Sequence, residues 1–358
     1  GKGSFVPRRP LLPGSGGLFQ SAYISHTLFP HEDFSRLIQD LFLRDGSACL
    51  EQPPLPGDPD LIEVLSRFYS LPEERLLIVS GAQQGLDITR SVLSIDDPAR
   101  IIFEDPSYPG AAALFMPGSF VPMTPEGPDP LLVREKALKT GARLLYTIPS
   151  VHNPTGYRYS PRVKRELCSI AREMDLYLIE DDSLSEFFPD PSPRFLDLVP
   201  ERTFYIKSLA KSTVSGNRLG ILVPPPPFFN AMMTAKSLTD ISTSGLLQRT
   251  ASRFIREGYF QAFIEKVLPV HHERREKLLH VLQDIPLFSV QESFCGFWLW
   301  VRLNREVDIA TPPWTEGRFF SPSPENRSFF RLAYMNMEAE EFSRGLLQIR
   351  RMAQTLSW

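Results

Sequence analysis

Two basic residues in the segment SLAKSTVSGNRLG, residues 208–220, are spaced so that they could capture a phosphorylated aldehyde. The amine of Lys211 could form an imine with the aldehyde, provided that burial or a neighbouring cation keeps part of it uncharged. The guanidinium of Arg218 could bind the phosphate in a bidentate manner, and the hydroxyl of Ser208 adds a donor. Lys207 carries the same amine four residues away, so residue types alone leave open which lysine reacts.

The residues on either side favour Lys211. The apolar run TFYIKS predicts a buried strand that ends before this lysine, and NRLGILV predicts a strand that begins after it. A lysine in the turn between two buried strands is poorly placed for bulk solvent, which is the condition that lowers the pKa of an amine.

Two further segments follow predicted strands and carry groups for a phosphate and a ring nitrogen. In VSGAQQGLD, Gly81 leads into a helix whose first amides, those of Ala82 and Gln83, could bind a phosphate. In LYLIEDD, Asp181 follows a buried strand, where a carboxylate is costly unless a positive group lies opposite. A pyridinium nitrogen is such a group.

Two other strand ends carry residues that could contact an aromatic ligand. Tyr108 in EDPSYPG could stack on a pyridine ring, although an ordinary half-buried tyrosine fits the segment equally well. Asn153 in VHNPTG lies in a predicted tight turn and could donate a hydrogen bond to a phenolate oxygen.

The order of apolar and amphipathic runs predicts an α/β fold. From about residue 75, short apolar runs alternate with helical patterns, as in a sheet covered by helices on both faces. One helix is predicted over 161–174, with Ser160 as its cap and Pro161 in its first turn. After residue 224 long helical stretches lead to a small α+β region with apolar runs at CGFWLWVRL and RSFFRLAYM. In such sheets, ligands bind beyond the carboxyl ends of the strands, where the segments described above lie.

Composition excludes several classes of protein. The 358 residues carry a formal charge of −3 with a pI near 6.1, which gives no overall signal for binding nucleic acid or a membrane. Three separated cysteines without CxxC spacing indicate neither disulfides nor a zinc site, and a reducing cytoplasm fits them. The neighbouring His271 and His272 point in different directions on a helix, so we expect surface residues and no metal site.

These segments occur in the order typical of the aminotransferase class I/II domain of pyridoxal phosphate (PLP) enzymes, and about residues 20–356 resemble that domain. The resemblance implies PLP as cofactor and the aspartate aminotransferase-like fold type I. This fold would comprise a large mixed-sheet domain at 16–260, followed by a helix and a small α+β domain at 261–358. It also implies roles for individual residues: Lys211 forms the imine, Asp181 pairs with the pyridine nitrogen, Asn153 donates to the phenolate, Tyr108 stacks on the ring, Ala82, Gln83, Ser208 and Arg218 bind the phosphate, and Arg331 in FFRLAY clamps a substrate carboxylate.

The segments SGAQQGLD, EDPSYPG and EDDSLSEF look most like those of the MocR-type subgroup of GntR transcriptional regulators. Residues 1–15, GKGSFVPRRPLLPGS, resemble the end of a winged-helix wing and its linker, although GKGS could also be an artificial leader. This resemblance implies a homodimeric effector domain that senses an amino compound through an aldimine, with DNA bound only by a domain absent from this sequence. The alternative is a free-standing aminotransferase acting on an amino acid and a 2-oxo acid.

Three departures from the family pattern bear on catalysis. Ala210 stands where the family often has a second serine, and Ser183 stands where the subgroup usually has a tyrosine. The segment between Trp300 and Arg331 is short, and we expect it to lack a helix that the family's small domain usually contains. We therefore expect cofactor binding with weak or vestigial transamination.

Overall fold

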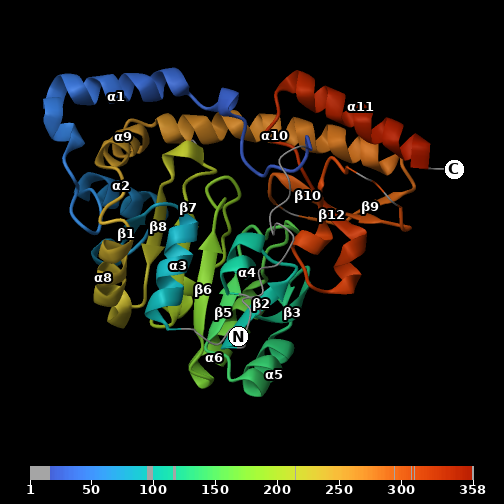
Figure 1. The fold of residues 1–358 in the computed structure, drawn as a ribbon, viewed down its shortest axis with the longest axis horizontal. Helices are drawn as coiled ribbons and strands as arrows, with labels where there is room; N and C mark the ends of the chain where they lie inside the picture. The colour runs from blue at the N-terminus through green and yellow to red at the C-terminus, as the bar shows by residue number, and fades with distance from the viewer. Residues whose placement is uncertain are drawn as a thin grey trace, which may run out of the picture.

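The computed structural model describes residues 17–94, 100–115, 118–213, 215–293, 295–307, 309 and 311–356. The wing and linker predicted at residues 1–15 lie outside these described residues. Two sheets stand beside each other, and the long helix α10 (Tyr259–Gln283) runs along both of them with α11 (Ala339–Leu356) at its side (Figure 1). Of the helices in the described ranges, none is long and apolar enough to cross a membrane.

The larger sheet has eight strands in the order β1-β8-β7-β6-β5-β2-β3-β4 and is mixed, as predicted. Only β8 and β4 run opposite to the other six strands, so the carboxyl ends of those six share one edge. The strands are β1 (Leu77–Val79), β2 (Ile101–Asp105), β3 (Ser119–Thr124), β4 (Gly127–Pro128), β5 (Leu144–Thr147), β6 (Tyr177–Asp182), β7 (Thr203–Ser208) and β8 (Gly220–Val223). The sequence analysis missed β3 and β4, because β3 has only one fully buried residue and lacks a continuous apolar run.

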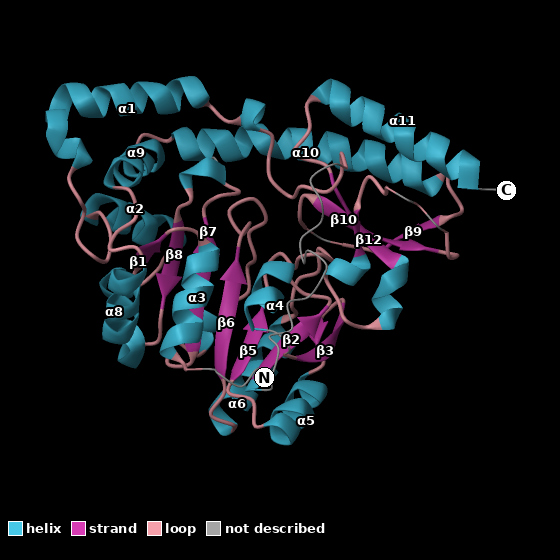
Figure 2. Ribbon diagram, viewed as in Figure 1, coloured by secondary structure: helices cyan, strands magenta, loops and turns pink. Residues whose placement is uncertain are grey.

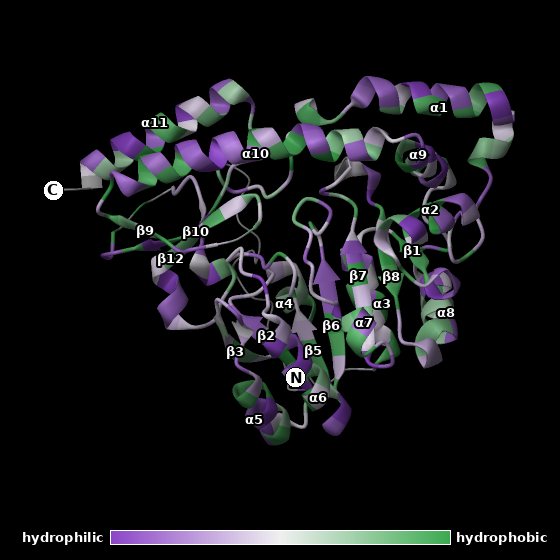
Figure 3. Ribbon diagram, turned by 180° about the vertical axis from the view of Figure 1, so that it is seen from behind, coloured by the Kyte–Doolittle hydropathy of each residue, from purple (hydrophilic) through white to green (hydrophobic). Residues whose placement is uncertain are grey.

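Helices cover both faces of this sheet (Figure 2), because its central strands are buried on both sides and expose alternate residues to each. Ile206 of β7 packs toward α3 and α8, whereas Tyr205 packs toward α2 and α9. The helices are α1 (His31–Asp45), α2 (Pro59–Tyr69), α3 (Ala82–Val92), α4 (Pro109–Phe115), α5 (Pro130–Thr140), α6 (Pro161–Glu173), α7 (Phe195–Leu198), α8 (Phe229–Thr239) and α9 (Gly245–Arg256). Figure 3 shows the mixture of hydrophobic and hydrophilic residues along α1, α10 and α11 that is typical of helices with one buried face.

Helix α6 begins and ends close to where the sequence predicted. The hydroxyl of Ser160 accepts a hydrogen bond from the amide of Val163, and Pro161 occupies the first turn. The cap satisfies an amide that the helix itself cannot pair, which explains why a short motif located this helix correctly.

The smaller sheet is antiparallel, in the order β11-β12-β10-β9. Its strands are β9 (Phe288–Val290), β10 (Trp298–Leu303), β11 (Thr315–Glu316) and β12 (Phe329–Ala333). Between β10 and β12 the described residues form β11 and two short 3-10 helices, η7 (Gly317–Phe319) and η8 (Pro324–Ser328), but no α-helix. The division into domains at 16–260 and 261–358 remains a proposal.

An N-terminal segment, residues 17–25, lies along the small sheet, and we call it the strap. The amide of Phe19 donates to the carbonyl of Pro313 over 2.8 Å, and its carbonyl accepts from the amide of Ala333 over 2.9 Å. Further along, the amide of Ser25 donates to the carbonyl of Met335 over 2.7 Å. Phe19 is fully buried in the core of the small sheet. The strap therefore belongs structurally to the C-terminal part of the chain, although it begins the described residues.

The expectation that His271 is a surface residue was wrong, whereas His272 is exposed. His271 lies on the face of α10 that packs against the small sheet, and its ring stacks on that of Tyr334 with 5.8 Å between centroids. Nδ1 of His271 is 3.1 Å from the Tyr334 hydroxyl. Burial, helped by His272 and Arg275, lowers the pKa of His271 to about 3.

Candidate functional site

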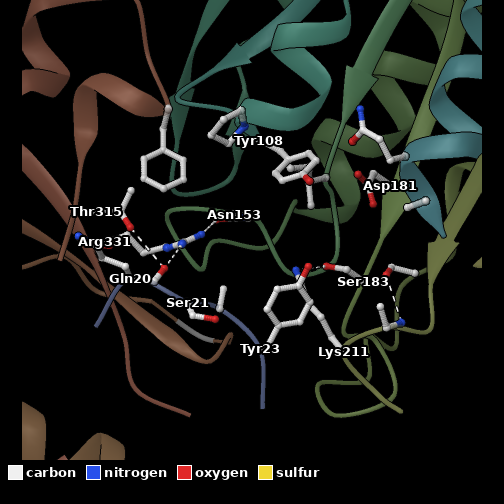
Figure 4. A pocket seen from close by; sticks show the side chains of 18 of the residues that line it. Gln20, Ser21, Tyr23, Tyr108, Asn153, Asp181, Ser183, Lys211, Thr315 and Arg331 are labelled. Atoms are coloured by element: carbon white, nitrogen blue, oxygen red, sulfur yellow. Dashed lines mark hydrogen bonds between the residues drawn. The ribbon is translucent and has the colours of Figure 1, made fainter. Parts of the chain in front are cut away.

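A cavity of about 240 Å³ lies between the carboxyl edge of the large sheet and the small sheet. Figure 4 shows its walls, with Asp181 of β6 and Tyr108 of the turn after β2 on one side and Thr315 and Arg331 on the other. Every residue that the sequence analysis selected lines this one cavity: Ala82, Gln83, Tyr108, Asn153, Asp181, Ser208, Lys211, Arg218 and Arg331. Eight of them come together at the carboxyl edge that the parallel strands share, and Arg331 reaches the cavity from β12 of the small sheet. Their chemical roles remain predictions.

Lys211 lies in the turn after β7, as predicted, and is partly buried. Its ammonium donates to the hydroxyl of Ser183 over 3.2 Å and lies 5.3 Å from the ring centre of Trp298. Burial lowers the pKa of Lys211 to about 8, with a smaller contribution in the same direction from Arg331, while Asp181 acts against it. About one-tenth of such an amine is uncharged at pH 7, which makes it a competent nucleophile.

Lys207 is a different kind of lysine, although it is only four residues away. Its side chain is fully buried, and its ammonium pairs with Glu186 over 2.7 Å and with Asp182 over 3.2 Å. Burial alone would lower the pKa of Lys207, but the two carboxylates raise it above its ordinary value. An amine that is held charged cannot attack an aldehyde, so this contrast favours Lys211 as the reactive lysine.

Asp181 stands at the end of β6 and is 6% exposed. Its carboxylate accepts a hydrogen bond from the hydroxyl of Tyr146 over 2.5 Å. Burial raises the pKa of Asp181 to about 6, although the Tyr146 hydroxyl and the charge of Lys211 oppose that rise. Such a group is stabilised as an anion by any cation placed in the cavity beside it.

The turn from β1 into α3 and the side chain of Arg218 form an anion-binding corner. Gly81 caps α3 with a φ of 83°, and a Cβ there would lie only 3.1 Å from a terminal nitrogen of Arg218. Gly220 approaches the Gly81 backbone so closely that its own Cβ would lie 2.9 Å away. These glycines let the guanidinium lie directly beside the free amides of the helix. Within the described residues, Arg218 has no hydrogen-bond or ion-pair partner, and it is exposed.

Tyr108 covers part of the cavity next to this corner. Its ring lies over Gly110, where a Cβ would come within 2.5 Å of the ring and the hydroxyl. Burial raises the pKa of Tyr108 to about 12, with Asp181 adding to the effect. The ring therefore stays neutral, and it lies in place to contact a flat ligand in the cavity.

Arg331 is buried on β12 without a carboxylate partner in the described part of the chain. One terminal nitrogen, Nη1, donates to Oδ1 of Asn153 over 2.8 Å, and the other, Nη2, donates to the carbonyl of Gln20 over 2.7 Å. The third nitrogen, Nε, is buried without any partner. Burial lowers the pKa of Arg331 to about 10. A buried guanidinium with an unfilled donor is suited to a carboxylate.

The sequence analysis missed the wall that the strap and the small sheet supply. Gln20 to Tyr23 of the strap line the cavity, together with Thr315 and Phe320. The ring centre of Phe320 lies 4.9 Å from the Arg331 guanidinium. No motif identifies these residues, because they lie far from the strand ends in sequence and reach the site only through the packing of the small sheet.

The family comparison agrees with this arrangement. Residues 26–349 match the family model of aminotransferase class I and II. The chain belongs to that family.

Relatives of two kinds align with this member of the family. The uncharacterized HTH-type transcriptional regulator YisV of Bacillus subtilis is 28% identical over 303 residues, which are 80% of this chain and 62% of YisV. The chain thus spans about three-fifths of that regulator. The 2-aminoadipate transaminase of Thermus thermophilus is 26% identical over 356 residues, covering 92% of this chain and 87% of the transaminase.

Solved structures confirm fold type I. The α-aminoadipate aminotransferase LysN from Thermus thermophilus, in complex with N-(5'-phosphopyridoxyl)-L-leucine, superimposes with a TM-score of 0.83 at 26% identity. The superposition covers 96% of this chain and 93% of that one.

Proposed function

We propose that this chain binds PLP at Lys211 and acts as the amino-compound-sensing domain of a GntR-type transcriptional regulator of the MocR kind. The observation that carries the proposal is the convergence of nine residues, selected from separate motifs, on one cavity whose lysine has a pKa of about 8. PLP supplies an aldehyde that reacts with amines and a pyridine ring that draws electrons from the bound amino compound.

The residues of the cavity fit this cofactor. Lys211 offers an amine that is partly uncharged at neutral pH. Asp181 would hold a proton on the ring nitrogen, because its buried carboxylate gains a cationic partner there. The unpaired Arg218 and the amides that begin α3 would bind the phosphate. Tyr108 would keep water from one face of the ring, since its own ring lies in the cavity wall.

The other end of the cavity suits a ligand that carries both an amine and a carboxylate. The unpaired Nε of Arg331 is a buried donor, and a ligand carboxylate would satisfy it. Asn153 holds the guanidinium from the other side through its Oδ1 atom. Its side-chain amide remains available to donate to the phenolate oxygen of the cofactor.

Two kinds of observation support a regulator. The alignment with YisV covers 80% of this chain but only 62% of the regulator, as expected if this chain corresponds to one domain of such a protein. At the site, Ala210 stands where the family often has a second serine, Ser183 stands where the regulator subgroup usually has a tyrosine, and both departures disfavour efficient transamination. In this proposal, the chain dimerises with itself and DNA is bound by a separate winged-helix domain. We place the protein in the cytoplasm, where the three buried, unpaired cysteines would stay reduced.

The second candidate function is an aminotransferase that acts on an amino acid and a 2-oxo acid. The alignment with the 2-aminoadipate transaminase favours it, because that alignment covers most of both chains. In this case Lys211 would also move a proton between the substrate Cα and the cofactor, which its pKa of about 8 permits.

Two experiments test these proposals. Purified protein with PLP should absorb visible light, and borohydride reduction should attach the cofactor to Lys211, as mapped by mass spectrometry. Lys211→Ala should lose the covalent product, and a product that maps to Lys207 would contradict the assignment.

The second experiment adds amino acids and 2-oxo acids to the protein with PLP and measures both its absorbance spectrum and the keto acid formed. A regulator should bind amino acids, which shifts the spectrum, but should form little keto acid. Sustained turnover at rates common for enzymes, roughly 1 s⁻¹ or more, would instead establish the aminotransferase.

A further inference from the structure

The carboxylate-binding arginine is joined directly to the strap. Nη2 of Arg331 donates to the backbone carbonyl of Gln20 over 2.7 Å, and the hydroxyl of Thr315 donates to the same carbonyl over 3.3 Å. Figure 4 shows these two side chains converging on Gln20. The charged donor is the stronger of the two, because hydrogen bonds from an ionised group exceed those between neutral groups.

The unfilled donor of Arg331 lies on the same edge of the guanidinium. Nε and Nη2 form one fork, and Nε is the nitrogen of Arg331 that is buried without a partner. The opposite nitrogen, Nη1, is already engaged by Asn153. Nη2 carries two N–H groups, and a carboxylate bound in a bidentate manner to the Nε–Nη2 edge would use one of them. Its anionic oxygen would then share this nitrogen with the Gln20 carbonyl, and the two oxygens would repel each other.

We propose that a ligand carboxylate competes with the Gln20 carbonyl for Arg331, so that ligand binding loosens the strap from the small sheet. This inference rests on the proposed function. It adds a physical link between ligand binding at the site and the attachment of the strap to the small sheet.

At its two ends the strap is held by the bonds of Phe19 to Pro313 and Ala333, by the burial of the Phe19 ring, and by the bond of Ser25 to Met335. At Gln20 the side-chain amide also donates to the carbonyls of Pro312 and Trp314 over 3.3 and 3.4 Å, but the bond from Arg331 is the charged one. Its loss would therefore loosen the strap locally, around Gln20.

The strap is also a wall of the cavity, so the ligand and the strap cannot be independent. Gln20, Ala22 and Tyr23 line the site, and Tyr23 is 40% exposed. The sequence analysis predicted a wing and linker at residues 1–15, on the N-terminal side of the strap. A loosened strap would change contacts at the beginning of the described residues, and a contact that differs between the free and the bound state is what coupling between two sites requires.

The test compares two stable probes that differ only in the carboxylate: phosphopyridoxyl-L-leucine and phosphopyridoxyl-3-methylbutylamine. Each is bound to the apo protein, and hydrogen exchange is followed by mass spectrometry in peptides covering residues 17–25 and 329–335. With the leucine probe we expect the amides of Phe19 and Ala333 to exchange about tenfold faster than with the amine probe, the factor expected for loss of a charged hydrogen bond. Equal or slower exchange with the leucine probe would overturn the inference.

Two variants separate this coupling from a general change in stability. Arg331→Met should show the faster exchange without any ligand, and the leucine probe should add nothing further. Thr315→Val removes the other donor to the Gln20 carbonyl but keeps Arg331, so its response to the leucine probe should persist. A full response in Arg331→Met would overturn the inference. If neither probe binds the unaltered protein, the proposed function and the coupling between ligand and strap are both contradicted. If both probes bind and the hydrogen-exchange rates of the strap are equal, only the coupling is contradicted.

Discussion

The ammonium of Lys211 lies 3.2 Å from the hydroxyl of Ser183, at the position where the family subgroup usually has a tyrosine. Ser183 therefore contacts the reactive amine itself. Burial lowers the pKa of Lys211. A hydroxyl that accepts a hydrogen bond from a charged amine favours the protonated form, so we expect Ser183 to oppose that effect.

This relationship predicts the pH dependence of PLP capture by the apo protein. With a pKa of about 8, the uncharged fraction of Lys211 and hence the capture rate should rise about tenfold between pH 7 and pH 9 and then level off. Ser183→Ala should shift this curve to lower pH, whereas Ser208→Ala should leave its midpoint in place. Stopped-flow absorbance measures the rate, and a rise that continues beyond pH 10 would show an ordinary exposed amine.

Replacement of Arg331 should weaken ligands that carry a carboxylate. We expect Arg331→Met to lower the affinity for phosphopyridoxyl-L-leucine by about 1.5 to 3 kcal/mol, the range of a charged hydrogen bond. Phosphopyridoxyl-3-methylbutylamine lacks the carboxylate and should bind both proteins equally, which controls for damage to the cavity. Calorimetric titration gives both affinities. An equal loss of affinity for the two probes would show that Arg331 does not bind the carboxylate.

Lys207 should matter for stability, because Lys207→Met leaves the carboxylates of Asp182 and Glu186 buried without their cation. We expect this substitution to lower the free energy of unfolding by about 3 to 5 kcal/mol, as measured by urea denaturation. Arg162→Met removes an exposed cation that also pairs with two carboxylates, and it should leave stability nearly unchanged. Similar effects of the two substitutions would contradict the contrast between buried and exposed pairs.

His271 should make the fold sensitive to acid. Its pKa of about 3 in the folded protein lies below the ordinary value of 6.5, so between these values only the unfolded chain binds the proton and stability falls as pH falls. Between pH 7 and pH 5, His271 should account for about 2 kcal/mol of lost stability. In His271→Phe that part of the pH dependence should disappear, whereas His272→Gln, at an exposed position, should keep it. Urea denaturation at both pH values provides the measurement.

The sequence by itself determined the strands that end at the site and the residue types placed there. Buried parallel strands appear as continuous apolar runs, and short motifs such as SGAQQGLD and VHNPTG follow them directly, so Asp181, Asn153 and Lys211 could be selected without coordinates. Strand β3, which lies between β2 and the edge strand β4, escaped prediction because one buried position among six gives no such run.

Only the tertiary structure decided which charges are paired and which are free. Lys207 and Lys211 look alike in sequence, yet packing buries one against two carboxylates and leaves the other beside a serine hydroxyl. Packing also buried His271 and brought Gln20 within 2.7 Å of Arg331 from a position 311 residues away. Ion pairing, desolvation and contacts between distant segments depend on distances in space, which local patterns along a chain do not encode.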